Sequence, residues 1–214
     1  MRWSAVLILT GLACVHCGCK APADGAGEDR TLAVASELPP DIRTRLDAVG
    51  WSERVGTSLG LWVSVARQGM FGIENGRVRF AYQCSTAKKG VGNQENSNQT
   101  PLGWHQIEER FGDGLPLGAV FSERKFTGEF WRPGELAEKD LILSRIMWLR
   151  GLEEGVTSGP GIDSHERYIY IHGTPAESKL GLPASHGCIR LSNKHVVELF
   201  DRTTTGTRVL IVAW

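Results

Sequence analysis

Residues 168–193 read YIYIHGTPAESKLGLPASHGCIRLSN, and this stretch decides both the fold and the chemistry that the sequence predicts. It opens on a β-type run, 168–171, in which tyrosine alternates with isoleucine. His172 follows that run directly, and Cys188 comes sixteen positions later among serine, histidine and glycine. Ser192 and Asn193 then mark the start of a helix, because both residue types are favoured as N-caps. A strand, a chemically rich loop and a helix are therefore expected in close succession.

The pairing of His172 with Cys188 is typical of a thiol that carries out covalent acyl transfer. A thiol with an ordinary pKa of about 8.5 is only a few per cent ionised at neutral pH. An imidazole within reach can take its proton or stabilise the ion pair, and we expect His172 to hold the sulfur ionised. Gly187 lets the backbone turn sharply, so that neighbouring amides can point at a developing oxyanion. Together these parts supply a nucleophile, a base and oxyanion donors.

A zinc site is a second interpretation of the same residues. His172, His186 and Cys188 would give three ligands, with His165 or His195 as the fourth. The spacings match no zinc-finger pattern, and this part of the chain contains no Cys-x-x-Cys pair. A third interpretation makes the cysteine a buried core residue and the histidine a surface residue. We prefer the nucleophile.

The rest of the chain favours a β-rich fold. Its 26 glycines and 9 prolines follow no collagen-like period and indicate many turns. Residues 59–66 and 78–82 alternate with period two on either side of a turn at 74–77, which predicts a hairpin. Further strands are expected at 104–107 and 207–213.

Other stretches are predicted from local composition and spacing. Residues 41–49 and a segment beginning at Asn193 have apolar residues at helical spacing. A polar, glycine-rich loop is expected at 87–103 and a long irregular stretch at 111–135. The apolar residues of 136–150 fit either a helix or an extended run.

Residues 1–19 have the pattern of an export signal. Arg2 precedes an uncharged apolar run, 5–13, which is too short to span a bilayer comfortably and fits a signal peptide. A buried N-terminal strand or helix is the alternative. Residues 20–56 are small, polar and rich in proline at first, which predicts a linker that contains the short helix.

Three cysteines follow the apolar run at once: Cys14, Cys17 and Cys19. A small residue precedes two of them, as in the lipobox of bacterial lipoproteins. The leader is therefore expected to be a signal peptide, and a lipoprotein-type signal peptide is one form that it could take. Ordinary cleavage near residues 21–26 is an alternative, and so is a small metal cluster with His16. The metal cluster lacks the second ligand pair of a structural zinc site.

Charge and composition exclude some classes of function. Lysine plus arginine number 24 and aspartate plus glutamate number 24, so no basic excess indicates nucleic acid as the partner. The apolar fraction of 41% is sufficient for a packed core. No run of 18 apolar residues exists, which excludes a polytopic membrane protein.

Cysteine usage outside the leader leaves one choice open. Cys84 and Cys188 could close a disulfide in an exported protein. If Cys188 is the nucleophile it must stay reduced, and Cys84 is then expected to be a small core residue.

The segment from His172 to Arg190 resembles the signature of the L,D-transpeptidase (YkuD-type) catalytic domain. That signature is a histidine, a gap of mid-teens length, then Ser/Thr-His-Gly-Cys, an apolar residue and Arg or Asn. Residues 61–68, 83–86 and 100–103 also resemble segments of this family. The resemblance covers 57–214 and implies a mainly β, β-sandwich-like catalytic domain with a few short peripheral helices.

The resemblance implies roles at the centre of the site. Cys188 would be the nucleophile and His172 the general base that activates it. Gly173 would orient the imidazole through its backbone carbonyl. His186 and Gly187, with the Cys188 amide, would line the oxyanion site, and help in orienting the base is a second role for His186.

Two further residues of the motif would support the site. Ser185 would act through hydrogen bonds. Arg190 would act through its charge, with the carboxylate of a substrate as a possible partner. The mechanism implied by the resemblance requires no metal and no organic cofactor.

The substrate class implied by the resemblance is the stem peptide of peptidoglycan. Cys188 would attack the L-centre carbonyl of diaminopimelate in a tetrapeptide, release D-Ala and hold a thioester. An amine would resolve it, giving a 3→3 cross-link, an exchanged D-amino acid or a bond to a protein. Water as acceptor would make the chain an L,D-carboxypeptidase or hydrolase, and a non-catalytic wall-binding module is the alternative outside enzymes.

Partners and location follow from that reading. Carbapenem-type β-lactams are expected as inhibitors, and nucleic acid is not expected as a partner. The chain is expected in the periplasm or cell envelope, with membrane contact only through an N-terminal lipid anchor.

Overall fold

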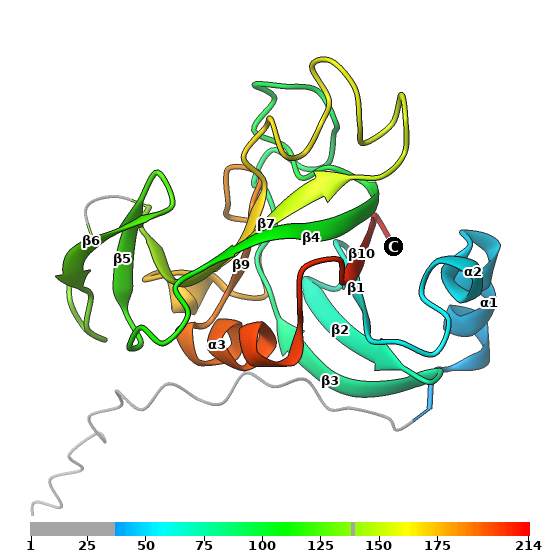
Figure 1. Cartoon of the computed structure of the whole chain (residues 1–214), viewed down its shortest axis with the longest axis horizontal. Helices are drawn as coiled ribbons and strands as arrows, with labels where there is room; N and C mark the ends of the chain where they lie inside the picture. Colours follow the sequence, from blue (N-terminus) through cyan, green and yellow to red (C-terminus); the bar gives the residue numbers. More distant parts are fainter. Residues whose placement is uncertain (1–36, 138–139) are drawn as a thin grey trace, which may run out of the picture.

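The computed structural model describes residues 37–137 and 140–214, and its strands form a single mixed sheet (Figure 1). The strands are β1 (Gly60–Ser64), β2 (Gly69–Glu74), β3 (Arg77–Gln83), β4 (Gly103–Phe111), β5 (Ala119–Ser122), β6 (Lys125–Phe130), β7 (Ile142–Gly151), β8 (Tyr170–Gly173), β9 (Ile189–Leu191) and β10 (Arg208–Val212). The helices are α1 (Pro40–Ala48), α2 (Trp51–Arg54), the 3₁₀ turn η1 (Glu177–Lys179) and α3 (Asn193–Arg202). The predicted class, mainly β with a few short helices, is confirmed.

The sheet is curved and branched rather than flat. Its main path runs β3-β2-β1-β10-β4-β7-β5-β6, and β8 joins β7 with β9 beyond it. Two neighbouring pairs are parallel, β1 with β10 and β8 with β9, and the other strand pairs are antiparallel. The long strands β4 and β7 carry the sheet from one half to the other (Figure 1).

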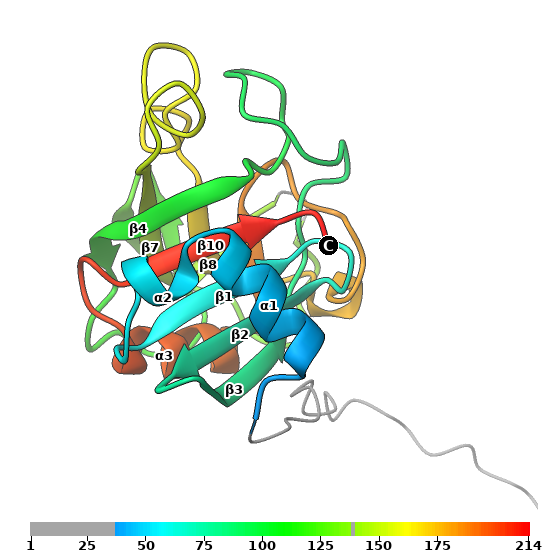
Figure 2. The same cartoon turned by 90° about the vertical axis from the view of Figure 1, so that its right-hand side faces the viewer.

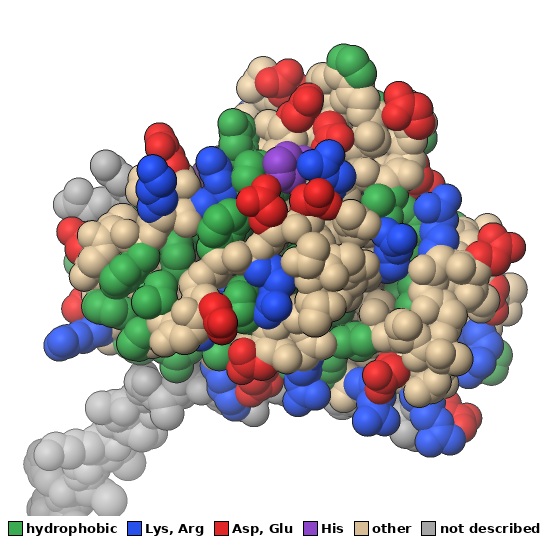
Figure 3. Space-filling view, viewed as in Figure 1, with side chains coloured by type: hydrophobic (Ala, Val, Ile, Leu, Met, Phe, Trp, Pro, Cys, Tyr) green, Lys and Arg blue, Asp and Glu red, His purple; other side chains and the backbone are tan. Residues whose placement is uncertain are grey.

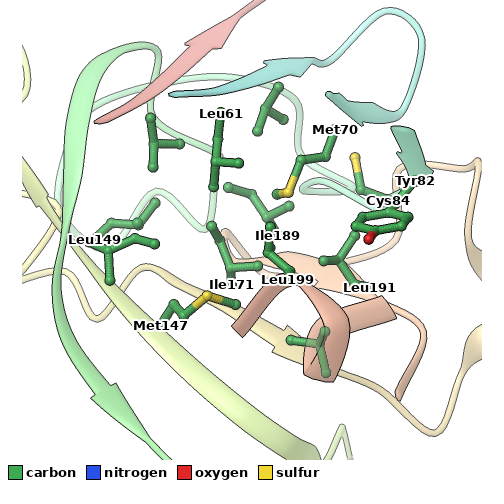
Figure 4. Close-up of a cluster of buried hydrophobic side chains, with 14 of the residues drawn as sticks. Leu61, Met70, Tyr82, Cys84, Met147, Leu149, Ile171, Ile189, Leu191 and Leu199 are labelled. Atoms are coloured by element: carbon green, nitrogen blue, oxygen red, sulfur yellow. The ribbon is translucent and has the colours of Figure 1, made fainter. Parts of the chain in front are cut away.

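A central core lies between the two halves of the sheet. Leu61 of β1 and Met70 of β2 point toward Leu149 of β7 and Ile171 of β8, with Leu199 of α3 beside them (Figure 4). All five side chains are essentially inaccessible to water. The alternation predicted for residues 59–66 therefore does not separate core from solvent, because the opposite face of β1 is buried as well.

Helices α1 and α2 cover that opposite face. Figure 2 shows them lying across β1, β2 and β10. Leu46 and Trp51 pack with Trp62, Trp104 and Leu210 in a second apolar cluster. The expected linker, 20–56, thus differs from the structure over its described part: the residues from Leu38 onward are packed on the domain, because they carry enough apolar surface to be buried there.

The stretch 111–135, expected to be irregular, contains the hairpin β5–β6. Its two-residue turn, Glu123 and Arg124, has positive φ at both positions, yet it lacks the Asn-Gly signal by which such turns are recognised. Figure 3 shows hydrophobic side chains gathered over this hairpin, where Phe126 and Phe130 are exposed.

The ambiguous run 136–150 is extended over β7. Met147 and Leu149 face the central core, whereas Ile146 and Trp148 belong to a third apolar cluster beneath the β5–β6 hairpin. Because both faces of β7 are buried, its apolar residues do not show the period of two that marks a half-exposed strand.

The expected export signal, 1–19, and the first part of the linker lie outside the described residues. Within the described ranges, no helix combines the length and the apolar character needed to cross a membrane.

Candidate active site

Strands β8 and β9 bring the two predicted catalytic residues to one face of the sheet. They are parallel neighbours with Ile171 opposite Ile189 and His172 opposite Arg190. Both isoleucines point into the central core. Because side chains alternate along a strand, His172 projects from the opposite face, and Cys188, the residue immediately before β9, continues the alternation on that same face.

His172 lies inside β8 rather than after a strand at 168–171. Tyr168 has φ 56°, a left-handed conformation that a strand cannot contain, and β8 begins only at Tyr170. The left-handed turn at Tyr168 directs its carbonyl oxygen to Sγ of Cys188.

Cys188 carries a free thiol held by two backbone groups. Its Sγ–H donates to the carbonyl of Tyr168 at 3.4 Å, and the N–H of Tyr170 donates to Sγ at 3.4 Å. Burial raises the pKa of the thiol to about 11, and the Tyr170 N–H and the charges of Arg190 and Arg167 only partly oppose this. This shift favours the protonated thiol, whereas the sequence predicts a sulfur held ionised by histidine.

His172 is oriented by the backbone next to it. Its Nδ1 lies 2.8 Å from the carbonyl oxygen of Gly173, and since a carbonyl can only accept, Nδ1 carries the proton and Nε2 has a free lone pair. Burial lowers the pKa of the imidazole to about 4. In the described part of the chain, His172 and Cys188 make their hydrogen bonds with backbone groups and not with each other.

Gly173 is a glycine because of close packing. A Cβ there would lie 2.5 Å from Oδ1 of Asn193 and 2.7 Å from the carbonyl of Leu143. The missing side chain lets β8 approach β7 and α3 closely, which fixes the carbonyl that holds the imidazole.

The loop that carries the cysteine is held by hydroxyl groups. Ser185 Oγ donates to the Cys188 carbonyl at 2.6 Å and accepts from the Gly187 amide at 3.2 Å. Buried Thr100 donates to the Gly187 carbonyl at 2.9 Å. Gly187 has φ 134°, in the region that favours glycine.

These contacts show which of the expected oxyanion donors is free to bind an oxyanion. The Gly187 amide is used within the loop, whereas the Cys188 amide has no acceptor among the described residues. The free donor is therefore the amide of the nucleophile itself, on the same residue as the sulfur.

Arg190 and His186 meet at a residue that sequence reasoning missed. Asp140 accepts from Nη2 of Arg190 and from Nδ1 of His186, the latter at 3.1 Å. Arg190 is only 4% exposed and its charge is already paired with Asp140, whereas the sequence predicts a substrate carboxylate as its partner. Asp140 lies 50 positions from Arg190, and no local spacing in the sequence indicates the contact.

His186 does not orient the base. Its side chain is 74% exposed and bonds to Asp140, and the acceptor on the proton of His172 is the Gly173 carbonyl. A pocket of about 390 Å³ adjoins this group and is lined by Asp140, His186 and Arg190 together with Glu135, Leu136, Ala137, Pro175, Ala176, Lys179 and Ala184. Cys188 and His172 are not in its lining.

Arg167 is a second charged residue that the sequence did not reveal. Its Nη2 donates to the carbonyl of Gln99 at 2.8 Å, and its charge acts to lower the pKa of Cys188. It stands in the turn just before β8, where a prediction based on strand periodicity has no signal for it.

The zinc site and the disulfide are the two alternatives to a catalytic thiol that the geometry bears on. The described residues contain no group of three or more His, Cys, Asp or Glu side chains arranged to hold a metal ion. Cys84 is a free thiol, fully buried in the central core, where burial raises its pKa to about 12. No disulfide joins it to Cys188.

The comparison with protein families gives one match. Residues 59–211 match the family model described as YkuD: L,D-transpeptidase catalytic domain. Among curated proteins, a probable L,D-transpeptidase of Salmonella typhimurium, ErfK/SrfK, is 35% identical over 96 residues, which cover 42% of this chain and 30% of that protein. A probable L,D-transpeptidase of Escherichia coli, YbiS, is 46% identical over 46 residues, or 22% of this chain and 15% of that protein. The matched region thus spans less than a third of either relative.

Solved structures give similar matches. An L,D-transpeptidase from Xylanimonas cellulosilytica is 21% identical, with a TM-score of 0.45, over 82% of this chain and 71% of that one. The L,D-transpeptidase LdtMt1 in complex with imipenem is 22% identical, with a TM-score of 0.45, over 72% of this chain and 58% of that one. By the family match over most of its length, the chain belongs to the YkuD family of L,D-transpeptidase catalytic domains.

Proposed function

We propose that this chain is a peptidoglycan L,D-transpeptidase in which Cys188 carries the acyl group of a donor stem peptide. The observation that supports this best is the placement of Cys188 and His172 on one face of two parallel strands, with Nε2 of the imidazole left as the proton acceptor. Family membership supports a peptidoglycan substrate, and the donor in this proposal is the tetrapeptide stem.

The first half-reaction forms a thioester. Nε2 of His172 takes the proton of the thiol as Sγ attacks the L-centre carbonyl of diaminopimelate. The amide of Cys188 donates to the oxyanion that forms. The carbon–nitrogen bond to the terminal D-Ala then breaks, and the imidazolium returns the proton to the departing amine.

The second half-reaction moves the acyl group to an amine. The acceptor attacks the thioester carbon and gives its proton to Nε2, and the sulfur leaves and recovers a proton from the imidazolium. The product is a 3→3 cross-link, an exchanged D-amino acid or a protein joined to the wall, according to the amine. Throughout the cycle the Gly173 carbonyl holds the imidazole in the required tautomer.

An uncharged thiol and imidazole suit a reaction that starts only when substrate is bound. Neither group is ionised at neutral pH, because burial raises the pKa of one and lowers that of the other. Proton transfer therefore accompanies attack on the carbonyl, and the reaction does not require a thiolate in the resting protein.

A carbapenem tests the nucleophile directly. The full chain is incubated with imipenem, the intact mass is measured, and the modified peptide is located by digestion, since the chain has five cysteines. One adduct on Cys188 is expected, and Cys188→Ala should abolish it. Cys84→Ala is the matched control, because Cys84 is the other cysteine of the described domain and lies in the core.

The outcomes separate the proposal from its alternatives. An unmodified but folded wild-type protein, or an adduct that persists in Cys188→Ala, would contradict the proposal. A wall-binding module would bind isolated peptidoglycan equally well with and without Cys188, and it would give no adduct.

The proposal includes location. The substrate lies in the cell envelope, and residues 1–19 have the pattern of an export signal with cysteines that could take a lipid. Fractionation of cells with and without this leader, followed by mass analysis of the mature N-terminus, tests both points.

A further inference from the structure

The β5–β6 hairpin carries an arginine where its backbone disfavours one. Ser122 pairs with Lys125, and the two residues between them, Glu123 and Arg124, have φ of 48° and 66°. Such a turn is normally built from Asn and Gly, because other residues are disfavoured in the left-handed region. A side chain in such a strained backbone conformation is usually held there by its contacts, which often belong to a functional site.

Aromatic groups hold the guanidinium of Arg124 in place. Nη1 donates to the hydroxyl of Tyr170 at 3.0 Å. Cζ lies 4.4 Å from the centroid of the Trp148 ring and 5.4 Å from that of Tyr168, distances at which a cation is attracted to a ring face. Trp148 in turn stacks on Tyr168 with centroids 5.6 Å apart. We call Arg124, Trp148, Tyr168 and Tyr170 the arginine shelf.

The shelf is built from the same two tyrosines that hold the catalytic sulfur. The carbonyl of Tyr168 accepts from Cys188 Sγ, and the amide of Tyr170 donates to it. Tyr170 and Cys188 also pack in one apolar cluster. The guanidinium therefore lies one tyrosine side chain away from the nucleophile, on the same face of the sheet.

The charge of Arg124 is unpaired within the described part of the chain. The nearby acidic residue that raises its pKa, Glu109, has its carboxylate 3.0 Å from Nε2 of His165. Arg190 is the opposite case, since Asp140 already pairs with it. A fixed, partly exposed guanidinium with free donors is suited to bind a carboxylate.

We propose that Arg124 binds a carboxylate of the acyl donor and makes the enzyme select stem peptides in which that carboxylate is free rather than amidated. This inference rests on the proposed function. The donor has two carboxylates close to the scissile bond: that of the terminal D-Ala and that at the far end of the diaminopimelate side chain. Both carboxylates present the same chemistry to a guanidinium, so donors amidated at one or the other are needed to tell which of them Arg124 binds.

The test measures kcat/KM for acyl-enzyme formation with three donors. One is the unmodified tetrapeptide, one carries a carboxamide at the terminal D-Ala, and one carries it on the diaminopimelate side chain. For the wild-type chain, amidation of the bound carboxylate should lower kcat/KM about tenfold or more, the size expected for a charge-assisted hydrogen bond. The donor that shows the loss identifies the carboxylate.

Variants assign the selectivity to the side chain. Arg124→Gln should treat all three donors alike to within about twofold, and Arg124→Lys should keep part of the preference. Lys125→Gln is the matched control, because it removes the neighbouring exposed cation of the same hairpin and should keep the full preference.

A purely structural role for Arg124 predicts something different. Arg124→Gly relieves the left-handed turn, so its melting temperature should stay near that of the wild type while the preference is lost. The rate at which uncharged iodoacetamide alkylates Cys188 checks that the site is intact in each variant. Equal use of the three donors by the wild type, or a full preference in Arg124→Gln or Arg124→Gly, would overturn the inference. Absence of any acyl-enzyme with the wild type would contradict the proposed function instead.

Discussion

Burial fixes the charge state of the catalytic pair before substrate arrives. A surface thiol and imidazole with ordinary pKa values near 8.5 and 6.5 can exchange a proton with little cost. Here the thiol of Cys188 has a pKa of about 11 and the imidazole of His172 a pKa of about 4, and burial is the main cause of both. The protonated thiol and the neutral imidazole are therefore the resting forms over a wide pH range.

The rate of alkylation of Cys188 tests this charge state. At pH 7 a thiol of pKa about 11 is ionised to roughly one part in ten thousand, so iodoacetamide should react about a hundredfold or more slowly than with an ordinary thiol. The rate should keep rising as the pH approaches 11. Peptide mapping isolates the signal of Cys188 from the leader cysteines, and a rate that levels off below pH 8 would show that the sulfur is ionised in the resting protein.

At the scale of elements, the site depends on loops that brace two short strands. Strand β9 has three residues and β8 has four. The segment after β3 supports them, since Ser85 exchanges backbone hydrogen bonds with Arg190 at 2.9 Å. Thr100 links the same region to the catalytic loop, because its hydroxyl accepts from the amide of Ala87 and donates to the carbonyl of Gly187.

Removal of the Thr100 hydroxyl tests this bracing. Thr100→Val keeps the volume but leaves a buried amide and a buried carbonyl without a partner, which should lower the free energy of unfolding by about 2–4 kcal/mol. Acylation should slow by about tenfold or more, because the nucleophile is displaced. Thr100→Ser keeps the hydroxyl and should restore most of the stability and most of the acylation rate. If urea unfolding and acylation kinetics show Thr100→Val to be equal to the wild type, the hydrogen bonds of Thr100 are not needed to hold the loop.

The parts of the site that the sequence could predict are those defined by local spacing. Alternation along adjacent strands places His172 and Cys188 on one face, and Ser192 caps α3 through the amide of His195 as expected. Asp140 and Arg124 could not be predicted, because each reaches the site through pairing between distant segments.

The fold shows the same division. Half-exposed strands and the capped helix follow a clear period, whereas β7 is buried on both faces and its pattern fits a helix as well. The β5–β6 hairpin escaped prediction because its turn uses Glu and Arg in a conformation normally signalled by Asn and Gly.

At the scale of the whole molecule, the curved sheet separates three apolar layers. Helices α1 and α2 cover one, the two halves of the sheet enclose the second, and the β5–β6 hairpin covers the third. The catalytic sulfur borders the third layer. The fold thus buries the imidazole of His172, which would otherwise be charged at low pH, and leaves the sulfur of Cys188 partly accessible.

That burial predicts how stability depends on pH. His105 and His172 both have a pKa of about 4 in the folded state, lowered by burial, against about 6.5 when unfolded. Between these values the unfolded chain binds more protons, so stability must fall as the pH falls from about 6.5 to 4, by roughly 3 kcal/mol for each histidine at 1.36 kcal/mol per pH unit.

Urea unfolding at pH 7, 5.5 and 4.5 checks this prediction. His105→Gln is the informative variant, because His105 bonds to Gly103 and Ser164 and lies outside the catalytic pair. It should be less stable than the wild type at pH 7 but should lose about half as much stability on acidification. A wild-type free energy of unfolding that does not change over this range would contradict the neutral, buried state of both imidazoles.

The transfer of an acyl group from Cys188 to an amine is tested most directly by its product. The full chain is incubated with a disaccharide tetrapeptide and an excess of a second D-amino acid, and the muropeptides are resolved by mass spectrometry. We expect a tetrapeptide in which the added D-amino acid has replaced the terminal D-Ala, with no product from Cys188→Ala. A tripeptide as the sole product would show that water takes the acyl group, and an unchanged donor would show that the folded chain does not break this bond.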